Sequence, residues 1–106
     1  MNNMKRINNY GDIRWYKYGT EILHRLDGPA VECANGYKSW YKEGKLHREN
    51  GPAAEYTNGN KCWFKEGLYH REDGPAVEYH NGTVEFWLHG VQCNSLDELV
   101  IKNILE

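Results

Sequence analysis

The sequence has few of the features that mark a membrane, secreted or nucleic-acid-binding protein. Its 106 residues contain no run of 18 apolar residues, so no membrane-spanning helix is expected. Residues 1–9 lack the apolar core of a signal peptide. Cys33, Cys62 and Cys93 have neither the even number nor the spacing of a disulfide framework, which favours a reducing, cytoplasmic location. The net charge of −2 does not favour nucleic acid as a partner.

The sequence does contain a segment that occurs three times. Residues 24–32, 47–55 and 70–78 share the pattern His-Arg-x-Asp/Asn-Gly-Pro-Ala-x-Glu, and successive copies begin 23 residues apart. A fixed period of this length indicates a repeat architecture. The chain therefore divides into a flexible N-terminus (1–9), an array over 10–93 (half-repeat 10–23, repeats 24–46, 47–69 and 70–92) and a C-terminal cap (94–106).

Each repeat is predicted to fold as a β-hairpin. An Asn-Gly pair such as Asn35-Gly36 is typical of a two-residue type I′ turn, in which both central residues have a positive φ. This turn would pair Val31 with Trp40, and strand alternation would place both side chains on the same, covered face of the sheet.

The last segment changes to a helical pattern. Ser95 and Glu98 have the spacing of a capping box, and the apolar residues after them recur at helical intervals. A helix from Leu96 to Asn103 or Ile104 is expected to close the sheet beside Val84, Phe86 and Leu88. The predicted fold is an all-β repeat, an extended, twisted antiparallel sheet of consecutive β-hairpins with a short C-terminal capping helix.

The repeated unit resembles the MORN-repeat variant family over roughly residues 10–92. The resemblance lies in a glycine, an aromatic residue four positions later and a second glycine, here Gly36/Trp40/Gly44, Gly59/Trp63/Gly67 and Gly82/Phe86/Gly90. The His-Arg-x-Asp-Gly-Pro-Ala form is similar to a subgroup of bacterial, phage and large-virus proteins. The resemblance implies a sheet of consecutive hairpins that serves as a scaffold, binding module or lipid-contacting accessory rather than as an enzyme.

The repeated histidines do not predict a metal site. Equivalent residues two strands apart are separated by about 10 Å, which is too far for ligands of one zinc ion. Each His-Arg pair has two interpretations. It can brace the corner together with Asp27, Asn50 or Asp73. Alternatively, Arg25, Arg48 and Arg71 form a stripe that grips phosphate or carboxylate groups.

Aromatic side chains form the second candidate site. Tyr37, Tyr41 and Phe64 are expected on the face opposite Trp40 and Trp63, with Trp87 in the matching row. An exposed row of rings is typical of a partner site. The alternative is that the rings are buried against the sheet's own twist or against a second copy of the chain.

The repeated acids are a weaker candidate. Glu32, Glu55 and Glu78 are too far apart for the paired carboxylates of a retaining glycosidase, whereas the predicted register makes Glu78 and Glu85 direct neighbours. A solvated charged face is the preferred interpretation over catalysis. No nucleophile–base set is visible, so we expect no enzymatic activity and neither a metal nor another cofactor.

These patterns favour a non-catalytic module that binds a protein partner and could also dimerise through an open sheet edge. Neither nucleic acid nor a membrane is the expected partner. The alternatives are a phage- or mobile-element-borne inhibitor of a host defence protein or its nucleotide signal, and a hydrolase that uses the His, Arg and Glu rows. The predicted partner-binding residues are Arg25, Arg48, Arg71, Tyr37, Tyr41, Phe64 and Trp87.

Overall fold

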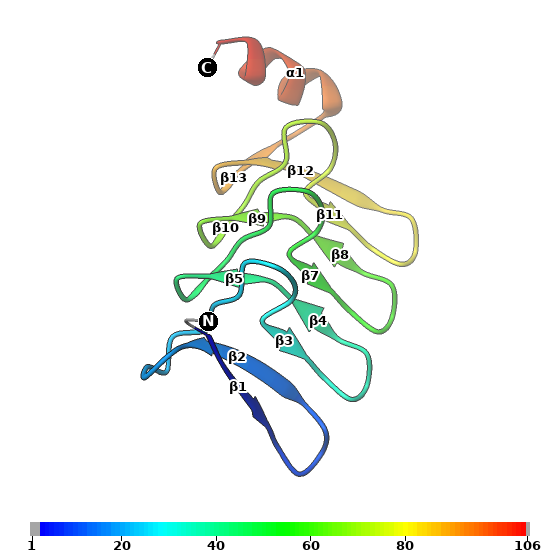
Figure 1. Cartoon of the computed structure of the whole chain (residues 1–106). Coiled ribbons are helices and arrows are strands. Elements are labelled where there is room, and N and C mark those ends of the chain that lie inside the picture. Colours follow the sequence, from blue (N-terminus) through cyan, green and yellow to red (C-terminus); the bar gives the residue numbers. More distant parts are fainter. Residues whose placement is uncertain (1–2, 106) are drawn as a thin grey trace.

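The computed structural model describes residues 3–105, which form a long antiparallel sheet followed by one helix (Figure 1). The strands are β1 (Asn3–Ile7), β2 (Ile13–Lys17), β3 (Val31–Glu32), β4 (Lys38–Ser39), β5 (Tyr41–Lys42), β6 (Lys45–Leu46), β7 (Ala54–Glu55), β8 (Lys61–Cys62), β9 (Phe64–Lys65), β10 (Leu68–Tyr69), β11 (Val77–Glu78), β12 (Val84–Leu88) and β13 (Val91–Cys93), and the helix is α1 (Leu96–Leu105). The predicted fold class is confirmed.

Within residues 3–105, nine of the strands join in one sheet, in the order β1-β2-β3-β4-β7-β8-β11-β12-β13. The remaining strands form two short pairs, β5-β6 and β9-β10, which continue the hairpins beyond the main sheet (Figure 1). The molecule measures 45 × 30 × 17 Å.

Backbone hydrogen bonds recur with the sequence repeat. The N–H of Trp40 donates to the carbonyl of Ala53, and the N–H of Trp63 donates to that of Ala76, both at 2.7 Å. After each hairpin a His-Arg corner carries the chain back to the next strand of the main sheet. The repeated alanines Ala30, Ala53 and Ala76 are all fully buried beside these corners.

The Asn-Gly turns differ from the predicted type I′ geometry. Gly36 has a φ of 101°, whereas Asn35 is not among the residues with positive φ. The N–H of Gly36 donates to the carbonyl of Cys33, and the N–H of Cys33 donates to the carbonyl of Tyr37. This is a three-residue loop with a glycine bulge, which requires left-handed geometry only at the glycine. The Asn35 side chain instead accepts a bond from the Tyr37 N–H.

The type I′ geometry occurs at the second turn of each unit. The residue pairs with positive φ at both positions are Glu43-Gly44, Glu66-Gly67 and His89-Gly90. Each pair connects two strands in direct register, as in the pairing of Lys42 with Lys45. The prediction therefore assigned this turn type to the wrong end of the hairpin.

The extra loop residue shifts the register by one. Val31 lies opposite Ser39 rather than Trp40, and Val77 lies opposite Glu85, so the predicted Glu78–Glu85 neighbours are wrong. Alternation then gives the sheet an aromatic face, which carries Val31, Ala54 and Val77 with nearby rings, and a groove face, which carries Trp15, Trp40, Trp63 and the His-Arg corners.

Helix α1 begins one residue after Ser95, as the capping box predicts. Ser95 Oγ accepts a bond from the Glu98 N–H at 3.1 Å, and the Glu98 carboxylate accepts one from the N–H of Asn94. Leu99 is 1 % exposed and packs with Leu88, Cys93 and Phe86. Val84, the third expected neighbour, is exposed.

The N-terminus is more ordered than predicted. Residues 1–9 were expected to be loose, but Asn3–Ile7 form β1, which pairs along its whole length with β2. Residues 1–2 of that segment lie outside the described part of the chain, as does residue 106 of the predicted cap. The sequence of β1 has no alternating apolar pattern, and its strand conformation depends on the partner strand.

Candidate functional site

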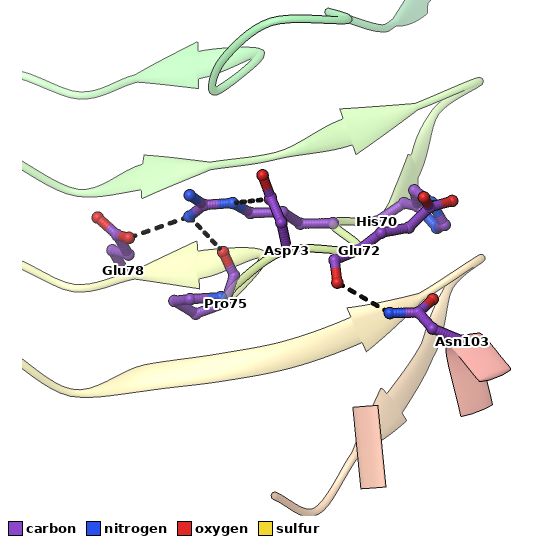
Figure 2. Close-up of polar contacts among 7 residues, drawn as sticks. His70, Glu72, Asp73, Pro75, Glu78 and Asn103 are labelled. Atoms are coloured by element: carbon purple, nitrogen blue, oxygen red, sulfur yellow. Dashed lines mark hydrogen bonds and ion pairs between the residues drawn. The ribbon is translucent and has the colours of Figure 1, made fainter. Parts of the chain in front are cut away.

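Each His-Arg corner is held together by its arginine. In the first corner, Arg25 donates through Nε to Asp27 at 2.9 Å and through Nη1 to the Pro29 carbonyl at 3.1 Å, and it is 3.4 Å from Glu32. The third corner repeats this arrangement, with Asp73, Pro75 and Glu78 around one guanidinium (Figure 2). The bracing interpretation of the sequence therefore describes the observed contacts.

The second corner differs in one respect. Arg48 donates to the Pro52 carbonyl at 3.0 Å and to Glu55 at 3.3 Å, but within residues 3–105 it makes no bond to Asn50. An asparagine lacks the charge with which Asp27 and Asp73 pair their arginines. The bonds to the proline carbonyl and the glutamate are therefore the part of the corner that all three repeats share.

Each guanidinium also stacks on a tryptophan of the preceding hairpin. The distance from Cζ to the ring centre is 4.4 Å for Arg25 and Trp15, 3.7 Å for Arg48 and Trp40, and 4.0 Å for Arg71 and Trp63. Such cation–π contacts contribute about 0.5–2 kcal/mol each. The corner glycine lets the guanidinium lie close to the backbone, since a Cβ at Gly28 would lie 2.9 Å from the Arg25 Cζ and one of the two would have to shift.

The histidines stabilise the type I′ turns. His24, His47 and His70 accept, at Nδ1, the N–H of the left-handed residue in the next turn, at 2.9–3.0 Å. An Nδ1 that accepts places the proton on Nε2. Nε2 of His47 then donates to Glu49 at 2.5 Å, and Nε2 of His70 donates to Glu72 at 3.2 Å. The hydrogen bond from His47 holds the pKa of the Glu49 carboxyl below its ordinary value.

Two open grooves lie between successive corners. Groove A has a volume of about 600 Å³ and is lined by residues 25–29, Trp40, Lys42 and residues 47–50. Groove B has a volume of about 580 Å³ and is lined by residues 48–51, Trp63, Lys65 and residues 70–73. Tryptophan, lysine and a His-Arg corner recur in both at the 23-residue spacing, so the two grooves are equivalent sites.

A third position of the same kind is filled by the chain itself. Phe86, Leu88 and Cys93 stand 23 residues after Trp63, Lys65 and His70, and they form the apolar cluster that receives Leu99 of α1. Asn103 of the helix donates its side-chain N–H to the carbonyl of Glu72 in the third corner at 2.8 Å (Figure 2). We call this site the third position.

The predicted partner-binding residues do not form one surface. Arg25, Arg48 and Arg71 line the grooves, while Tyr37, Phe64 and Trp87 lie on the aromatic face and pack against the buried Ala54, Cys62 and Val77. Tyr41 is also half-buried. The prediction that one face of the sheet presents both the arginines and the aromatic rings is therefore wrong.

The rings of the aromatic face cover their own sheet. Phe64 stacks on Tyr69 with centroids 4.5 Å apart, and Tyr69 contacts Trp87 at 5.0 Å. Tyr37 contacts Tyr56 at 5.1 Å. Burial raises the pKa of Tyr56 to about 12. This arrangement corresponds to the alternative in which the sheet buries these rings itself.

The repeated acids form a charged row on the groove face. Glu32 lies opposite Lys38, which lies opposite Glu55, and Lys61 lies between Glu55 and Glu78. Opposite charges paired across strands stabilise a sheet by about 0.2–1 kcal/mol per pair. Glu78 faces Val84 on its other side, so the closely spaced carboxylates that a hydrolase of this kind would need are not formed.

Other predicted properties are tested only in part. Among residues 3–105, no group of three His, Cys, Asp or Glu side chains is placed to hold a metal ion, and no helix is long and apolar enough to cross a membrane. Cys33 and Cys62 are free thiols. The outer edge of the sheet at β1 carries Lys5 and Arg6, which are typical of edges protected from further pairing, and dimerisation stays a prediction.

Sequence reasoning missed the residues that give the grooves their chemistry. Trp40 and Trp63 were assigned to a covered face, and Lys42 and Lys65 were not selected. The signal was present as a lysine two positions after each tryptophan, in Trp40-x-Lys42 and Trp63-x-Lys65, which the third unit replaces with Phe86-x-Leu88. That replacement marks the place where α1 binds.

Comparison with known proteins finds no similar protein. No protein-family model matches the sequence, and no curated protein or solved structure is significantly similar to it. The resemblance to MORN-repeat variants therefore depends on the quoted residues alone.

Proposed function

We propose that the protein is a non-catalytic module that binds a segment of a partner protein in its two open grooves. The observation that carries this proposal is the third position, where the same part of the repeat already holds a protein segment, helix α1. There the segment buries one leucine, Leu99, and donates one hydrogen bond to a corner carbonyl, that of Glu72.

The open grooves offer the same kind of contact. The carbonyls of Leu26 and Glu49 are the equivalents of the Glu72 carbonyl, and within residues 3–105 neither accepts a hydrogen bond. A tryptophan with a stacked arginine lines each groove. Tryptophan and arginine are enriched among the residues that dominate binding energy at protein interfaces.

The corner arginines take part as fixed elements of the grooves. Their side chains are 20–29 % exposed. Nη1 of each arginine donates to the corner's own acceptors, and Nε of Arg25 and Arg71 does so as well. Within the described residues, Nη2 of each arginine makes no hydrogen bond. A bound segment would therefore meet an ordered guanidinium edge at low entropic cost.

The experiment is a selection of random peptides of about 15 residues, long enough for four helical turns, on the immobilised protein. Affinities of the enriched peptides are then measured for a groove variant, Lys42→Glu with Lys65→Glu, and an aromatic-face variant, Tyr56→Ala with Tyr79→Ala. All four side chains are exposed or half-buried, and circular dichroism and the unfolding midpoint verify that each variant is folded.

The groove variant is expected to bind at least about tenfold more weakly, while the aromatic-face variant retains the affinity. The reverse result, or a selection that enriches no peptide, would contradict the proposal.

A further inference from the structure

The first corner differs from the other two at its third place. Glu49 and Glu72 occupy the third place of their corners, but the first corner has Leu26 there. Leu26 lines groove A and is 74 % exposed, although a leucine in water gains nothing for the fold. In this corner His24 also lacks the carboxylate to which the later histidines donate.

The substitution changes the charge of groove A. In groove B the ammonium of Lys65 lies 3.5 Å from Glu49. The equivalent ion pair in groove A would join Lys42 to residue 26, but residue 26 is a leucine, which has no charge. Within residues 3–105, Lys42 makes no ion pair.

The other charged groups near groove A are already engaged. Glu43, which feels the charge of Lys42, is bound to Lys17 at 2.7 Å. Glu49 is bound to His47 and Lys65. Arg25 and Arg48 are paired within their own corners, as described above. Among the described residues 3–105, Lys42 is therefore the cation of groove A that has no carboxylate of its own.

We propose, building on the groove-binding function, that groove A selects the partner and that the segment it takes carries an acidic residue beside a large apolar one. The carboxylate pairs with Lys42, and the apolar side chain covers Leu26 and the edge of Trp40. Groove B, with Lys65 already paired and Glu49 in place of the leucine, binds the same segment more weakly.

Protein fits this groove better than nucleic acid does. A phosphate backbone would also pair with Lys42, but it would bring further charges against the exposed Leu26 and the carboxylates of Asp27 and Glu49 at the rim. An isolated carboxylate next to an apolar side chain satisfies the lysine and buries the leucine together.

The test compares single variants, using peptides enriched by the selection and a dT oligonucleotide as the second probe. Leu26→Glu restores the repeat pattern and supplies Lys42 with an internal partner. Lys42→Glu removes the charge, and Lys65→Glu is the matched control in groove B. Residue 26 and both lysines are at the surface or partly exposed, and an unchanged unfolding midpoint shows that each fold is intact.

Enriched peptides are expected to contain Asp or Glu next to Leu, Ile, Phe or Met. Their affinity is expected to fall about tenfold or more with Leu26→Glu and with Lys42→Glu, since one charge-assisted hydrogen bond is lost, and to change less than threefold with Lys65→Glu.

Three results would overturn the inference. Peptide affinity that is indifferent to Leu26→Glu and Lys42→Glu contradicts it. Loss with Lys65→Glu alone contradicts it as well, but leaves the groove-binding function standing. Tighter binding of the dT oligonucleotide than of any peptide, dependent on Lys42, assigns groove A to nucleic acid instead.

Discussion

The two faces of the sheet bury their apolar residues in different ways. On the aromatic face, small residues such as Ala54 and Val77 are covered by rings from their own hairpins, including Phe64, Tyr69 and Trp87. On the groove face, tryptophans are covered by arginines, and a separate element, α1, closes only the third position. The hairpins therefore cover the aromatic face with their own side chains, whereas the groove face is covered by α1 at the third position and is open at grooves A and B.

The comparison shows how few residues separate an open groove from a packed one. At the third position phenylalanine, leucine and cysteine replace tryptophan, lysine and histidine, and the backbone of the hairpin is retained. The repeat provides the frame, and these three positions distinguish the unit that holds a helix of the same chain. The predictions below test each face in turn.

The largest effect is expected at the third position. Leu99→Ala removes the helix residue that is 1 % exposed and leaves a cavity beside Leu88 and Cys93, so the free energy of unfolding should fall by about 2–5 kcal/mol. Urea denaturation measures this change. Leu105→Ala, at a residue that is 79 % exposed, is the matched control and should stay within about 0.5 kcal/mol of the parent. Equal effects of the two variants would mean that α1 is not docked through Leu99.

A smaller effect is expected at the corners. His70→Ala removes the Nδ1 acceptor of the His89 N–H and a side chain that is 2 % exposed, which should cost about 1–3 kcal/mol. His24→Ala breaks the same kind of bond, to Glu43, but at a side chain that is 11 % exposed and whose Nε2, within residues 3–105, donates to no carboxylate. Its cost in urea denaturation should be lower. A larger loss of unfolding free energy with His24→Ala than with His70→Ala would contradict the expectation that the more buried histidine contributes more to stability.

The smallest effect concerns the aromatic face at high pH. Burial is the main cause that raises the pKa of Tyr41, Tyr56 and Tyr69, whereas a hydrogen bond to Glu85 is the main cause for Tyr79. Groups with a raised folded pKa contribute stability that is complete below the unfolded pKa of about 10 and is lost as the pH rises above it.

The free energy of unfolding should therefore decline above about pH 10. The ultraviolet absorbance of tyrosinate should appear at higher pH in the folded protein than in the protein unfolded in urea. Identical titration curves for the folded and unfolded protein would show that these rings are not covered.

Much of the architecture could be predicted from the sequence because the repeat is regular. The 23-residue spacing predicted the succession of hairpins. Ser95 and Glu98 predicted where the helix begins, and the Asp-Gly-Pro segment predicted the corner that an arginine braces. The register could not be predicted, since Asn-Gly fits both a two-residue turn and a three-residue loop, and the choice moves the side chains of one strand of each hairpin to the other face.

The grooves could not be predicted from the sequence either. They are formed by residues from two successive units, such as Arg25 with Arg48, and their openness depends on whether a separate element lies over them. Strand β1 illustrates the same limit, because residues 3–7 lack an alternating apolar pattern and become a strand only by pairing with β2.

Amide hydrogen exchange of the protein with and without a selected peptide tests the central claim most directly. The N–H groups of the corners at residues 26–28 and 49–51 make no hydrogen bonds within residues 3–105, so they should exchange rapidly in the free protein. The account predicts that the peptide slows exchange at these corners and leaves residues 54–56 and 77–79 unchanged. Protection confined to residues 54–56 and 77–79 would place the partner near the aromatic face and contradict the account.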